Sequence, residues 1–155
     1  MKKYISLLLL LIFTISAFSQ IKFEKAYFID NNGVKTECLI KNDDWKNNPD
    51  IIVYKLSEPG DKLSSSIKNI IEFEIYGETK YERHIVNIDV STQDLQKMDS
   101  NRRPIWEKQT LFLKVLIEGN TMLYKYTNNN TGSKYFYKTN TSNIKQLVSK
   151  YMTKI

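Results

Sequence analysis

Alternation of apolar and polar residues runs through most of the chain between residues 25 and 138. Successive side chains of a β-strand point to opposite faces, so this pattern predicts strands that each bury one face. The alternation is clearest in KYERHIVNIDV, residues 80–90. One face of this segment carries His84, Val86, Ile88 and Val90, and the other carries Arg83, Asn87 and Asp89.

Turn-forming residues divide the pattern into separate strands. Gly33 in DNNG and Gly77 before Glu78 are typical of hairpin turns. Residues 57–66, with Pro59-Gly60, are expected to form a turn, and residues 91–104 are expected to form a long loop. The predicted strands are 25–29, 34–41, 51–56, 67–77, 80–90, 106–119, 121–127 and 134–138, of which the last three form a meander.

The period changes near the end of the chain. In SNIKQLVSKYM, residues 142–152, apolar residues are spaced as on one side of a helix, and Thr141 or Ser142 is available as the N-cap. The apolar positions are Ile144, Leu147, Val148 and Tyr151. The prediction is a mainly β, α+β fold: a curved antiparallel sheet or small open barrel with a C-terminal amphipathic helix.

The first residues are typical of a secretory signal peptide. Lys2 and Lys3 precede an apolar run from Ile5 to Ile15, and Ala17-Phe18-Ser19 supplies the small residues of a cleavage site. We expect a signal peptide over 1–19, cleavage before Gln20, and a single β-rich domain over 20–155 without a transmembrane span. An uncleaved N-terminal anchor is the alternative, although the apolar run is short of the roughly 20 residues of a spanning helix.

Charge and cysteine content narrow the possible partners. The chain carries a net charge of +6, and its cationic residues are spread thinly, with Arg102-Arg103 as the one adjacent pair after the signal peptide. Without a basic stripe or recognition motif, no nucleic-acid partner is expected. Cys38 is the one cysteine, so no internal disulfide forms, and its apolar neighbours indicate a buried hydrophobe.

Candidate catalytic chemistry is sparse. The single histidine, His84, lies on an apolar strand face, which favours a partly buried residue over a catalytic one. Glu72 and Glu74 share a face, as do Glu82 and His84, so a carboxylate-dependent hydrolase is a third-ranked alternative. No catalytic residue, metal or cofactor is predicted.

KNDDWKNNPD, residues 41–50, could be either a calcium loop or a connector. Asp43, Asp44 and Asp50 are suitable ligands, but no calcium-loop spacing is met, which favours a connector between two strands. A plain connector does not explain Trp45. We expect this side chain to fold back over the core, with contact to a partner as the alternative.

Tyrosines provide the candidate binding surface. Tyr124 and Tyr126 share one face of their strand, and Tyr135 and Tyr137 share one face of the next. If the hairpin register brings these faces together, the four rings form a patch suited to a protein or a sugar. Core or cross-strand packing is the alternative.

Several segments in order resemble a group of uncharacterised secreted proteins of the Bacteroidetes. They are KNDDWKNNPDIIVYK, SIKNIIEFEIY, KYERHIVNIDV, TLFLKVLIEGNTMLYKY, KYFY and SNIKQL. The resemblance implies a β-rich N-terminal domain behind a signal peptide, which in longer members continues into an outer-membrane β-barrel-like region. It implies no activity and no catalytic residues.

The leading hypothesis is a non-enzymatic, exported module of the cell envelope that binds a protein partner or contributes to an outer-membrane assembly. Its destination is the periplasm, the outer-membrane periphery or the medium. The candidate contact surfaces are the tyrosines, Trp45 and the exposed edge of the meander, which can accept an added strand. A glycan- or small-ligand-binding domain using the same tyrosines is the alternative, and the oligomeric state is left open.

Overall fold

The computed structural model describes residues 22–91, 104–129 and 131–148. The predicted signal peptide, most of the predicted loop over 91–104 and residues 149–152 of the predicted helix lie outside these ranges. Every regular element in the described residues is a β-strand. The strands are β1 (Lys22–Asp30), β2 (Lys35–Asn42), β3 (Ile51–Lys55), β4 (Leu63–Ser66), β5 (Ile70–Ile75), β6 (Thr79–Asp89), β7 (Trp106–Ile117), β8 (Thr121–Asn128), β9 (Gly132–Thr139) and β10 (Lys145–Leu147).

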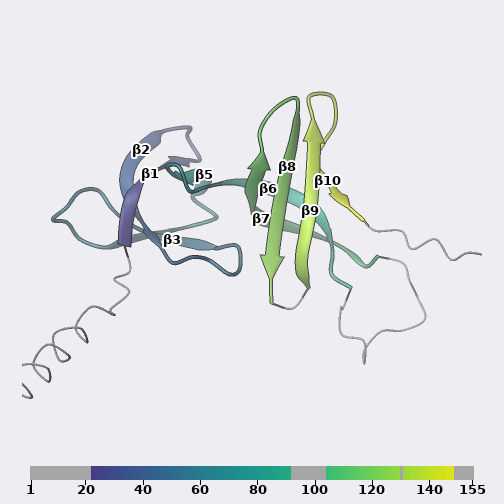
Figure 1. The fold of residues 1–155 in the computed structure, drawn as a ribbon, viewed down its shortest axis with the longest axis horizontal. Helices are drawn as coiled ribbons and strands as arrows, with labels where there is room; N and C mark the ends of the chain where they lie inside the picture. The colour runs from purple at the N-terminus through teal and green to yellow at the C-terminus, as the bar shows by residue number, and fades with distance from the viewer. Residues whose placement is uncertain (1–21, 92–103, 130, 149–155) are drawn as a thin grey trace, which may run out of the picture.

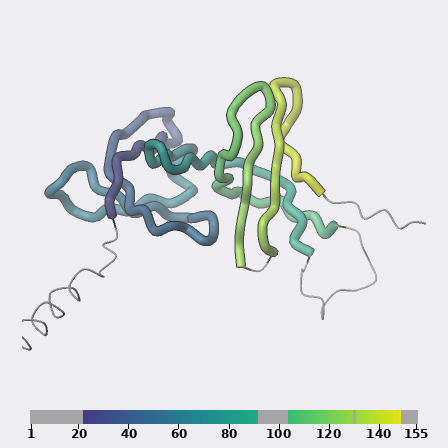
Figure 2. Tube along the Cα trace, in the orientation of Figure 1, coloured from purple at the N-terminus to yellow at the C-terminus, as the bar shows by residue number. Residues whose placement is uncertain are grey.

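The strands form one antiparallel sheet in the order β10-β9-β8-β7-β6-β5-β1-β2-β3-β4. The sheet curls into an open half-barrel, so the prediction of a curved antiparallel sheet is confirmed. Figure 1 shows the N-terminal strands curled at one end and the β8–β9 hairpin with β10 at the other. The tube in Figure 2 shows β6 running between these two ends.

The sheet buries opposite faces at its two ends. The first core lies under β1, β2, β3 and β5 and includes Phe73, Tyr81 and Phe112. The second core lies inside the β6–β10 end and includes Val86, Leu111, Leu113, Tyr124 and Phe136. In β6 the odd residue Tyr81 joins the first core and the even residue Val86 joins the second, so the buried face changes along this strand.

Strand β7 contributes residues to both cores, and its sequence reflects this. Leu111, Phe112 and Leu113 are consecutive and all buried, because Phe112 contacts the first core while its neighbours contact the second. A strand covered on both faces reads as a continuous apolar run. This explains why TLFLKVLI alternates less clearly than β6.

Several predicted hairpins are confirmed. Gly33 and Gly77 have φ values of 78° and 76°, and they turn β1 into β2 and β5 into β6. The meander is formed by β7, β8 and β9. Residues 57–66 are expected to form a turn, but they contain strand β4. The LSSS sequence of β4 has little apolar character, so it gives no strand signal, and the strand forms because it pairs with β3.

The predicted C-terminal helix is wrong for residues 142–148. Residues Lys145–Leu147 instead form β10, paired with Tyr135–Tyr137 of β9. Ser142, expected as an N-cap, closes the β9–β10 turn by accepting a hydrogen bond from Thr139 N at 3.0 Å. An isolated short helix is marginal in water, and pairing with the edge of β9 provides backbone hydrogen bonds that outweigh its weak propensity.

Residues 43–50, between β2 and β3, form a strap across the first core. Trp45 packs edge-on against Phe73 and Tyr81, with ring centroids 5.7 and 5.8 Å apart, so the expectation that it covers the core is confirmed. Asn48 then reaches strands β7 and β8. Its Nδ2 donates to Phe112 O at 2.7 Å and to Lys125 O at 3.0 Å.

Candidate functional site

The most distinctive surface feature is a seam between β6 and the end of the β9–β10 hairpin. Strand β5 pairs with β6 only from Thr79 to Glu82, so the later part of β6 has no ladder partner on that side. Strand β10 curls round to contact β6 there, without forming a ladder. The tie between them is a 2.9 Å hydrogen bond from Asp89 N to Gln146 Oε1.

The backbone of β6 directs hydrogen-bonding groups into the seam. Val90 N donates to Ile105 O, beside β7, at 2.8 Å, whereas Asp89 N turns the other way, toward β10. The N–H and C=O of one residue in an antiparallel strand point to the same side, and the side alternates along the chain. Ile85 and Asn87 therefore direct their N–H and C=O groups into the seam as well.

A cavity of about 380 Å³ fills the wider part of the seam. Beyond it, the bond from Asp89 to Gln146 ties β6 to β10. Its lining is basic and amide-rich, with Lys108 and Lys138 as its charged groups and no carboxylate. The full lining is His84, Ile85, Val86, Asn87, Lys108, Lys138, Asn143 and Ile144.

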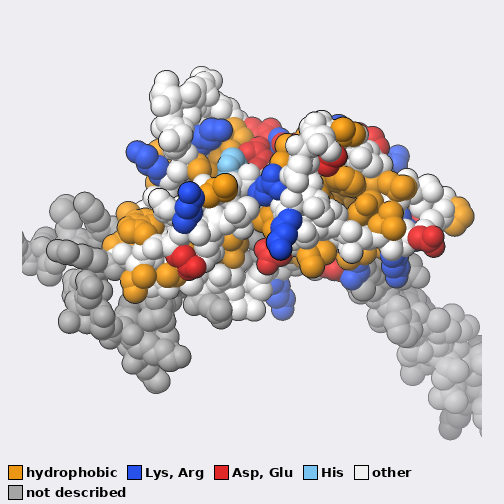
Figure 3. Space-filling view, turned by 180° about the vertical axis from the view of Figure 1, so that it is seen from behind, with side chains coloured by type: hydrophobic (Ala, Val, Ile, Leu, Met, Phe, Trp, Pro, Cys, Tyr) orange, Lys and Arg blue, Asp and Glu red, His pale blue; other side chains and the backbone are white. Residues whose placement is uncertain are grey.

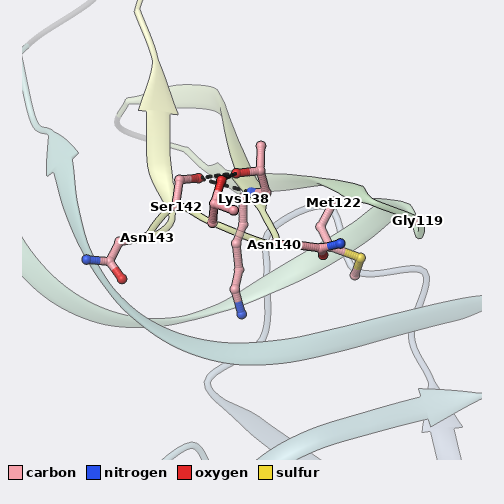
Figure 4. A pocket seen from close by; sticks show the side chains of 8 residues that line it. Gly119, Met122, Lys138, Asn140, Ser142 and Asn143 are labelled. Atoms are coloured by element: carbon pink, nitrogen blue, oxygen red, sulfur yellow. Dashed lines mark hydrogen bonds between the residues drawn. The ribbon is translucent and has the colours of Figure 1, made fainter.

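A second open cavity, of about 600 Å³, adjoins the seam at the β9–β10 turn. Figure 4 shows its lining side chains, with Lys138 extending away from the hydrogen-bonded Ser142 and with Asn140 and Asn143 on either side. Lys138 and Asn143 line both cavities. The Thr139 hydroxyl donates to the Ser142 hydroxyl at 2.8 Å and thereby shapes the turn.

His84 stands where the seam meets a polar cluster. Its Nε2 lies 3.0 Å from Glu82 Oε2, and the Tyr124 hydroxyl donates to the same oxygen at 2.9 Å. The bond to His84 is the main influence that lowers the pKa of Glu82, and Tyr124 adds to it against the opposing effect of burial. Burial and the Glu82 charge raise the pKa of Tyr124. Glu82 therefore remains a carboxylate, and its contact with Nε2 holds the His84 imidazole in place.

Lys80 extends this cluster to the neighbouring strands. Its Nζ lies 2.9 Å from Glu118, 3.6 Å from Glu72 and 3.7 Å from Glu82. Burial lowers the pKa of Lys80, but the three carboxylates outweigh this effect, so the pKa is raised overall. Tyr27 donates to Glu72 at 2.5 Å. The cluster ties β1, β5, β6 and β8 together.

This arrangement holds an imidazole but does not assemble a nucleophile. A serine, threonine or cysteine nucleophile is activated by an adjacent base, and in the described part of the chain no such hydroxyl or thiol bonds His84. Cys38 is buried, and burial, with the nearby Glu37 charge, raises the pKa of its thiol to about 11. Residues 22–91, 104–129 and 131–148 contain no group of three or more metal-binding side chains.

The hairpin register separates the predicted tyrosine patch. Tyr124 lies opposite Phe136, whereas Lys125 lies opposite Tyr135, so the two tyrosine pairs occupy opposite faces. Tyr124 is buried in the second core, and Tyr126 packs beside it. Tyr135 is exposed, and Tyr137 is half-buried on the outer face. The four rings do not form one surface, which corrects the premise of the patch.

Apart from His84, the residues that line the seam are not predicted as site residues from the sequence. Asn87 lies on the polar face of β6, as its position predicts, but no local motif marks the end of the β5 ladder that frees its backbone. Asn143 lies within the segment predicted to be helical, and Lys138 precedes that segment. A possible signal was the length of β6, since the run over 80–90 is longer than the apolar part of its partner.

The outer surface carries no concentrated charge on the side shown in Figure 3, where Lys and Arg side chains lie apart among apolar and acidic ones. Among the residues that the structure describes, no helix has the length and apolar character needed to cross a membrane. Comparisons of the chain with family models, with curated proteins and with solved structures found no match. The resemblance to secreted Bacteroidetes proteins stays a prediction.

Proposed function

We propose that this chain is a non-enzymatic, exported interaction module of the cell envelope that binds an extended segment of a partner protein along the seam. The segment adds to the free edge of β6 as an extra strand. The observation that carries the proposal is the pair of backbone positions, Ile85 and Asn87, whose N–H and C=O groups face an open cavity instead of a neighbouring strand.

Strand addition suits this edge for two reasons. Backbone groups without partners form a template for another chain, and proteins usually cover or blunt such edges. Here the edge opens on apolar side chains of the second core, Val86 and Ile144, which can receive an inward-pointing side chain. Main-chain hydrogen bonds then supply affinity and the apolar contact supplies selectivity.

Site-specific photo-crosslinking tests the proposal. A benzoyl-phenylalanine at Ile85, which is 63% exposed, is expected to give a discrete adduct with one envelope protein when the full chain is produced in its native host. The same probe at Leu56, which is 59% exposed and lies after β3, is the matched control and should give no such adduct.

A backbone variant separates strand addition from ordinary side-chain contact. Asn87→Pro removes the N–H that points into the seam and should abolish the adduct, whereas Asn87→Ala retains the N–H and should preserve it. Circular dichroism checks that both variants are folded. An adduct that persists in folded Asn87→Pro, or no adduct from Ile85 in the otherwise unaltered chain, contradicts the proposal.

A further inference from the structure

The shape of the seam limits what kind of segment can enter it. At one end the Asp89–Gln146 hydrogen bond holds β6 and β10 together, and the cavity beside it is lined by β6 from His84 to Asn87 and by Asn143 and Ile144. The open stretch of β6 runs from His84 to Asn87, which spans about 10 Å at roughly 3.3 Å per residue. It accommodates about three extended residues. An extended chain that lies along this stretch therefore meets a closed end at the Asp89–Gln146 bond.

The charges of the seam select which end of a chain fits. Lys108 and Lys138 are exposed, line the cavity, and make no ion pair with the described residues. They repel the ammonium of an N-terminus and attract a carboxylate. Two carboxylates near the cavity are already occupied: Asp89 Oδ1 accepts hydrogen bonds from Ser91 N at 2.9 Å and Ile105 N at 3.1 Å, and Glu82 Oε2 accepts one from the Tyr124 hydroxyl at 2.9 Å.

We infer that the seam captures the free C-terminal end of a partner protein, with its terminal carboxylate held by the Asn87 N–H, Lys108 and Lys138. This inference rests on the proposed function and specifies its ligand. The chain end lies along β6, and an apolar side chain near the terminus packs between Val86 and Ile144. No bond is made or broken, so the complex is a reversible one.

Affinity-selection mass spectrometry with two synthetic pools tests the inference. Both pools contain hexapeptides randomised at their last three positions; one pool ends in a free carboxylate and the other in a carboxamide. The unaltered protein is expected to retain free-acid peptides with apolar residues near the terminus. Retained sequences, resynthesised singly, should bind at least about tenfold more tightly as acids than as amides, as expected for a charge-assisted hydrogen bond.

Variants locate the effect in the seam. The double variant Lys108→Gln and Lys138→Gln should weaken the free-acid peptides about tenfold and leave the amides unchanged. Lys145→Gln together with Lys114→Gln lies outside the lining and serves as the charge-matched control. Equal retention of acids and amides, retention of neither pool, or an unchanged acid preference in the double variant overturns the inference. The Ile85 adduct then decides separately whether strand addition itself stands.

Discussion

Replacement of Asn48 in the strap by alanine is expected to lower the free energy of unfolding by about 2–4 kcal/mol. Its Nδ2 donates to Phe112 O and Lys125 O, and its Oδ1 accepts from Thr127 N at 2.9 Å. The pairing of β7 with β8 ends at Lys114 and Lys125, and at and beyond this pair the Asn48 carboxamide bonds backbone groups of both strands. Each lost bond contributes about 0.5–1.5 kcal/mol, and backbone groups left without partners add to the loss.

Urea unfolding followed by far-UV circular dichroism measures the effect. Asn47→Ala, the neighbouring residue with the same side chain, is the matched control and should change stability by less than about 0.5 kcal/mol. Asn48→Asp keeps one acceptor but turns a carboxylate oxygen toward two carbonyl oxygens, so it should be at least as destabilising at neutral pH. Were Asn48→Ala as stable as Asn47→Ala, the strap would contribute nothing to holding β7 and β8, and this reasoning would fail.

Two further predictions concern the polar cluster and the thiol. Glu82 has a lowered pKa, so its stabilising effect is fully present above the ordinary glutamate pKa of 4.5 and is lost as pH falls through the lower pKa of the folded state. Glu82→Gln should therefore lower the free energy of unfolding by about 1–2 kcal/mol at pH 7, and this difference from the unaltered protein should become smaller toward pH 3. Exposed Glu78→Gln is the control and should show little effect. A difference that does not change with pH would contradict this reasoning. Burial, with a smaller contribution from Glu37, raises the pKa of Cys38 to about 11, so Ellman's reagent at pH 8 should label the folded protein at least about 100-fold more slowly than the urea-unfolded one. Rapid labelling of the folded chain would show that the thiol is accessible.

The alternation in the sequence was enough to predict the strands that bury one face. In β6, Val86 and Ile88 are buried and Asn87 is exposed, as their positions indicated. The pattern says which residues share a face of one strand, but not which face of the whole sheet is covered. The reversal of the buried face between Tyr81 and Val86 therefore could not be predicted, although it explains the apolar run of β7.

Long-range contacts account for the remaining differences. The Asn48 carboxamide bonds Phe112, which is 64 residues away, and nothing local marks that contact. The apolar residues around Lys145–Leu147 have helical spacing, but pairing with the free edge of β9 makes this segment a strand. The tyrosines illustrate register: Tyr124 and Tyr135 would share a face after a shift of one residue, because such a shift moves every side chain of a strand to the other face.

The change of buried face along β6 gives one sheet two separate cores on opposite faces. The second core borders the seam, where Val86 and Ile144 line the cavity and the hydrogen bond from Asp89 to Gln146 closes one end. The first core lies on the opposite face under its own cover, Trp45. A chain end bound in the seam would therefore contact side chains of the second core and leave the packing around Phe73, in the first core, unchanged. The two faces of one sheet thus keep the side chains that would contact a partner apart from those that pack the N-terminal strands.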